Sequence, residues 1–164
     1  MTSLTADWLP FFGAELGATA ALTGLVVVAM SVNLSRIVAH PLLPGRALET
    51  LFALVGGVLI SSLMLIPHQP AAVLAIECAL VGVFSLFAPL RFQVEAYLHE
   101  TPNDQARPRT RAMLSCMVGV PFLIAGWEVW STGGVGLYWA AAGVILSLLV
   151  GVVGAWVLLV EIIR

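Results

Sequence analysis

The side chains of this 164-residue chain that could do chemistry are carboxylates and hydroxyls inside long apolar stretches. Glu15 and Glu77 are the clearest cases. An ionisable group at the centre of a membrane-spanning helix costs about 2.5–3.5 kcal/mol, which makes it a functional candidate by default. The chemistry that these groups suggest is a cation or proton site. The candidate set is Glu15, Thr19, Ser61, Ser62, Glu77 and Glu128.

A second interpretation gives the same side chains a packing role. Glu15 and Glu77 would then be protonated or hydrogen-bonded to nearby hydroxyls, each bond holding helices together by about 0.6 kcal/mol. Only the first apolar segment carries a polar stripe, which disfavours a pore through one subunit. An oligomer could still build a pore around that segment. Both interpretations remain open at this stage.

The elements that must position these side chains are five apolar segments. The chain is 60% hydrophobic and 10% charged, whereas soluble domains have about 25% charged residues. A helix needs about 20 apolar residues to span a bilayer. We therefore expect an all-α integral membrane protein, a bundle of five transmembrane helices forming a single domain over 1–164. The expected spans are about 10–33, 47–66, 71–90, 111–130 and 137–160.

The connectors between the spans predict the orientation of the bundle. All seven basic residues are arginines, and they follow the first, third and fifth segments only. Because basic residues stay on the cytoplasmic side, we expect the N-terminus outside and the C-terminus in the cytoplasm. Glu15 and Glu77 then lie about 7 and about 9 Å below the outer surface, at 1.5 Å per residue. The tryptophans at the same end form an aromatic belt: Trp8, Trp127, Trp130 and Trp139.

The first cytoplasmic connector is also predicted from its residues. We expect the first helix to continue through His40, and Pro44-Gly45 to belong to the turn that follows. Proline and glycine are the strongest local signals for such a turn.

Small residues predict which helix faces pack closely. In the fifth span Gly143, Ser147 and Gly151 recur every four residues, a spacing that lets helix backbones approach. Gly13 and Gly17 repeat the device in the first span. Glu15 lies about 200° around that helix from Gly13 and Gly17, because two residues separate each pair. With polar and small faces opposed, we expect the first span to be surrounded by protein, or to line a cavity or an oligomer axis.

The sequence lacks the motifs that identify several classes of enzyme and binding site. It has no G-x-S-x-G elbow, H-E-x-x-H zinc pair, P-loop or dinucleotide glycine motif. His40 and His99 are predicted on one side of the membrane and His68 on the other, which argues against a three-histidine metal site. No basic run suggests nucleic acid. We therefore expect no catalytic residues, no metal and no cofactor.

One stretch carries a family resemblance. Residues 23–38, TGLVVVAMSVNLSRIV, followed by residues 41–49, PLLPGRALE, resemble a family of small bacterial multi-pass membrane proteins. Some members are labelled modulator of FtsH protease. The resemblance covers the first span and its turn. It implies a bacterial cytoplasmic (inner) membrane location and an accessory or regulatory role, with no family catalytic residues to transfer.

Two functions follow as hypotheses. The first is a non-enzymatic accessory or regulatory partner of another membrane protein, which it binds through small-residue helix faces and the loop 101–110. The second is a homo-oligomeric cation or proton channel or transporter with an outer carboxylate site. Expected partners are membrane lipid and either a second copy or another membrane protein. A central first span with Glu15 facing an axis would favour conduction, and a peripheral one with its small face exposed would favour a partner helix.

Overall fold

The computed structural model describes residues 5–40, 43–99 and 106–163, and these ranges contain helices and turns but no strand. Five of the helices are long and apolar enough to cross a membrane. The expectation of an all-α chain with five such helices is therefore confirmed. The elements are η1 (Ala6–Trp8), α1 (Leu9–Val32), α2 (Leu34–Ala39), α3 (Leu43–Met64), α4 (Ala71–His99), α5 (Ala106–Ser131) and α6 (Gly136–Ile163).

Two details of the first connector differ from the prediction. The expected helix through His40 is interrupted at Asn33, whose φ of −105° and ψ of 14° are not helical, and it resumes as α2 over Leu34–Ala39. The Asn33 Nδ2 donates a hydrogen bond to the backbone oxygen of Ala29 at 2.9 Å. Pro44 and Gly45 belong to the first turn of α3 instead of a loop. Proline is tolerated there because the first amides of a helix have no intrahelical acceptor.

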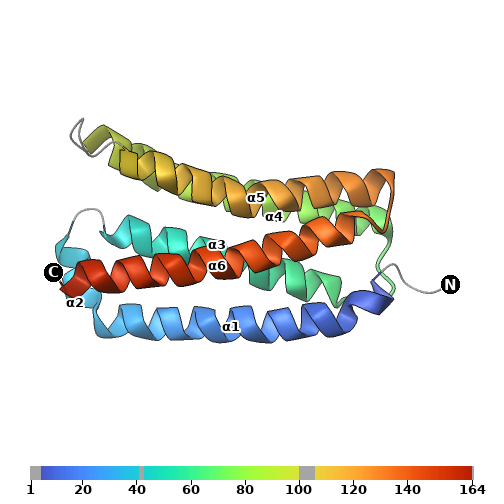
Figure 1. Cartoon of the computed structure of the whole chain (residues 1–164), viewed down its shortest axis with the longest axis horizontal. Helices are drawn as coiled ribbons and strands as arrows, with labels where there is room; N and C mark the ends of the chain where they lie inside the picture. Colours follow the sequence, from blue (N-terminus) through green and yellow to red (C-terminus); the bar gives the residue numbers. More distant parts are fainter. Residues whose placement is uncertain (1–4, 41–42, 100–105, 164) are drawn as a thin grey trace.

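The helices form three layers (Figure 1). In the middle layer α3 lies beside α6, α4 and α5 pair on one side of it, and α1 lies alone on the other. One end of the bundle carries Arg36, Arg46 and Arg111, and we call it the arginine end. The other end carries Trp8, whose ring lies 4.7 Å from that of Tyr138 between centroids.

Glycines bring the helices of the middle layer together. A side chain at Gly151 on α6 would overlap Leu54 on α3, and one at Gly57 on α3 would overlap Ser147 on α6. The ring of Phe122 on α5 packs directly against Gly143, in the space that a side chain at this position would need. Such close backbone approach is how helices gain packing energy where no hydrophobic effect operates between them.

The apolar core is divided along the bundle. The larger cluster fills the end opposite the arginines and includes Phe12, Leu74, Phe122 and Leu137, all at most 1% exposed. A smaller cluster at the arginine end consists of Ile37, Leu43, Ala47 and Leu158. The space among α3, α4, α5 and α6 toward the arginine end is incompletely filled, and a cavity lies there.

Candidate functional site

Two carboxylates of the predicted site, those of Glu77 and Glu128, accept hydrogen bonds from residues in nearby turns. Gln69, in the turn after α3, donates a hydrogen bond from Nε2 to Oε2 of Glu77 on α4. Thr132, at the end of α5, donates its hydroxyl to Oε2 of Glu128 at 3.0 Å. Each of these carboxylates therefore has a local structural role in closing a helix end.

The polar stripe of α1 faces the rest of the bundle. Thr19 is fully buried, and its Oγ1 donates to the backbone oxygen of Glu15 at 2.7 Å. Thr23 repeats the same bond to the backbone oxygen of Thr19, also at 2.7 Å. The hydroxyls are thus satisfied within their own helix, a common arrangement for Thr.

Two atoms of the predicted site are buried without a hydrogen bond to any described residue: Oε2 of Glu15 and Oγ of Ser61. Ser62, the next residue, is exposed. These side chains belong to adjacent helices, because α1 packs chiefly on α3.

The predicted site residues do not converge on one place. Glu15 belongs to α1 and Glu77 to α4, and these helices lie on opposite sides of the middle layer (Figure 1). Within one chain the two carboxylates therefore do not form a joint cation site. No cluster of three or more His, Cys, Asp or Glu side chains that could hold a metal ion occurs among the described residues.

The glycine face of α1, defined by Gly13, Gly17, Ala21 and Gly24, points away from the bundle. Apart from the adjoining residues and backbone of α1 itself, no described atom lies within 4 Å of a Cβ placed at any of its three glycines. In the most apolar 18-residue stretch of the Ala6–Val32 span only 11% is buried, whereas the share is 44% in the corresponding stretch of α3. The first span is therefore not surrounded by protein within this chain, and its small-residue face is open.

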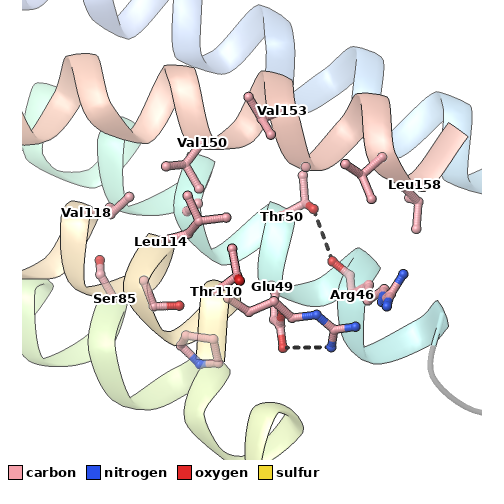
Figure 2. A pocket seen from close by; sticks show the side chains of 16 residues that line it. Arg46, Glu49, Thr50, Ser85, Thr110, Leu114, Val118, Val150, Val153 and Leu158 are labelled. Atoms are coloured by element: carbon pink, nitrogen blue, oxygen red, sulfur yellow. Dashed lines mark hydrogen bonds and ion pairs between the residues drawn. The ribbon is translucent and has the colours of Figure 1, made fainter. Parts of the chain in front are cut away.

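A cavity of about 430 Å³ lies among α3, α4, α5 and α6 (Figure 2). Its polar part is formed by Arg46 and Glu49 from the first turns of α3 and by Arg111 from α5. Nη1 of Arg111 lies 4.0 Å from Oε1 of Glu49, and both side chains are 13% exposed. Pockets of this size hold small ligands in many proteins.

The remaining walls of the cavity carry hydroxyl groups on one side and apolar side chains on the other. Hydroxyls come from α3, α4 and α5, at Thr50, Ser85, Thr110 and Ser115. The α6 wall is aliphatic, at Val150, Val153, Val157 and Leu158. The result is an amphipathic space with its charges at one end.

Sequence reasoning missed this cavity. The sequence pattern marks the arginines as signals of topology and does not connect them with Glu49. One signal was available: Arg46 and Glu49 are three residues apart, and so share a helix face. The partner helix that completes the cavity could not be identified from that spacing. The parts of the loop 101–110 before Ala106 lie outside the described residues.

No protein-family model, curated protein or solved structure matches this chain. Functional inference therefore rests on the exposed face of α1 and on the cavity.

Proposed function

We propose that this chain is a non-enzymatic membrane protein that binds a helix of another membrane protein through the glycine face of α1. The observation that carries the proposal is the peripheral position of α1 with Gly13, Gly17 and Gly24 open. The role is accessory or regulatory, and the membrane is the bacterial inner membrane. A membrane protease is the first partner to test, in line with the resemblance of the first span.

The physical argument concerns what a glycine face does in lipid. Helices associate in a bilayer through close van der Waals contact, and small residues four apart allow it. Within α6 the small residues Ser147 and Gly151 are covered by α3. Gly13 and Gly17 have the same spacing and no cover from the described residues. A helix from a second protein supplies that cover.

The rotation of α1 favours this proposal over conduction. Thr19 is fully buried, and Glu15 on the same stripe is half-buried. If several copies surrounded an axis through the open face of α1, they would present glycine and alanine to it. Glu15 would then lie on the wrong side of the helix to line a path for cations.

The test is co-purification in mild detergent from the native host. We expect the wild-type chain to recover a stoichiometric partner, and Gly17→Ile to lose it, because a branched side chain separates the helices. Leu80→Phe is the matched control, because it adds bulk on α4 at a position that is 63% exposed. Recovery of the bait alone under gentle crosslinking, or equal recovery by both variants, would contradict the proposal.

A further inference from the structure

The polar end of the cavity combines charges of both signs. Among the described residues that line it, two arginines, Arg46 and Arg111, accompany one carboxylate, that of Glu49. The 4.0 Å separation of Arg111 Nη1 from Glu49 Oε1 is longer than the roughly 2.7–2.9 Å of a charge-assisted hydrogen bond. Glu49 therefore leaves much of the donor capacity of Arg111 unused.

The buried polar atoms of the cavity that lack a hydrogen bond to any described residue include two possible donors, Nη2 of Arg111 and Oγ of Ser85, and one acceptor, Oε1 of Glu49. A buried donor without an acceptor costs free energy. An arginine fork matches the oxygens of a phosphate in geometry as well as in charge. The polar end of the cavity thus suits a ligand that brings phosphate oxygens.

The apolar wall suits a hydrocarbon chain. Val150, Val153 and Val157 recur on one side of α6 at helical spacing and line the cavity. Val153 and Val157 are also 52% and 43% exposed, so this wall reaches the surface of the bundle. A chain can therefore lie along α6 and enter from the side, without passing the charged end.

We propose that the cavity binds an anionic phospholipid, with its phosphate against Arg46 and Arg111 and part of one acyl chain along α6. Basic pockets between membrane-spanning helices are known to take such headgroups. The five apolar helices place the chain where lipid is abundant. The site is separate from the glycine face, because α1 contributes none of its lining residues.

The test is a lipid titration of the delipidated full chain, followed by native mass spectrometry. Wild type binds phosphatidylglycerol more tightly than phosphatidylcholine. Arg111→Gln weakens phosphatidylglycerol binding by about tenfold or more, the scale of a lost hydrogen bond to a charged group. Glu49→Gln tightens it, because the competing carboxylate is gone. Arg36→Gln, at an exposed position of the same end, leaves it unchanged.

The opposite sign expected for Glu49→Gln keeps the test independent of folding defects, because a misfolded variant cannot bind more tightly. Ala53→Phe fills the apolar part and weakens lipid binding. Inorganic phosphate alone serves as the second probe. Equal affinity for phosphatidylglycerol and phosphatidylcholine, weaker binding by Glu49→Gln, or phosphate binding as tight as lipid binding would each overturn the proposal. Arg111→Gln should leave co-purification through α1 intact.

Discussion

Thr19 on α1 packs against Gly57 on α3, so closely that a Cβ at Gly57 would lie 3.1 Å from Cγ2 of Thr19. This contact fixes the rotation of α1 about its own axis. Because Gly17 is two residues from Thr19, it lies about 200° around the helix. The contact that buries the polar stripe is therefore also what turns the glycine face outward.

Gly57→Ala should destabilise the bundle by about 1–3 kcal/mol, the usual cost of adding bulk to a packed site. The new methyl group overlaps Ser147 and presses on Thr19. The measurement is the free energy of unfolding in mixed micelles. Gly24→Ala is the matched control on α1, because its Cβ meets no described atom, and it should cost nothing. Equal effects of the two changes would contradict the assigned packing.

The number of long apolar helices could be predicted, because each contains a run of apolar residues of membrane-spanning length. The rotation of α1 could not. A glycine face and a Thr-Glu face are both plausible interfaces, and the choice depends on Thr19 fitting the space that Gly57 leaves. The early start of α3 was missed because Pro44 resembles a turn residue while also suiting the first turn of a helix.

The candidate sites were predicted less well than the fold. Glu15 and Glu77 were correctly placed inside apolar helices, but their depth says nothing about the order in which the helices pack. The middle layer keeps them apart. The cavity is lined by Arg46 and Arg111, which lie far apart in the sequence and border the same space only because α3, α4, α5 and α6 surround it. Helix neighbours of this kind are not encoded in local spacing.

Ion flux should be absent from liposomes that contain the purified chain. The reason is that Glu15 faces the bundle and Glu77 is bound by Gln69 across a turn. A pH-sensitive dye and a potassium gradient measure the flux. Glu15→Gln and Glu77→Gln should behave as the wild type does. A wild-type flux that Glu15→Gln abolishes would instead support the conduction hypothesis.

The predicted orientation can be checked by cysteine labelling in spheroplasts. The background is Cys78→Ala with Cys116→Ala, which removes both native thiols. Gly134→Cys, in the exposed turn before α6, should react with an impermeant maleimide added outside. Ser35→Cys, exposed on α2, should react only after the membrane is permeabilised. The reverse pattern would mean that the arginine end faces outward.

Site-specific photocrosslinking in the native membrane tests partner binding by α1 most directly. A photoreactive residue replaces Val28, which is 61% exposed. At 100° per residue Val28 lies about 20° from Gly17 around α1, and so on the glycine face. The control is the same residue at Leu80 on α4, 63% exposed. We predict a discrete crosslink to a second membrane protein from Val28 and none from Leu80. Crosslinks only to lipid at both positions would contradict the proposed function.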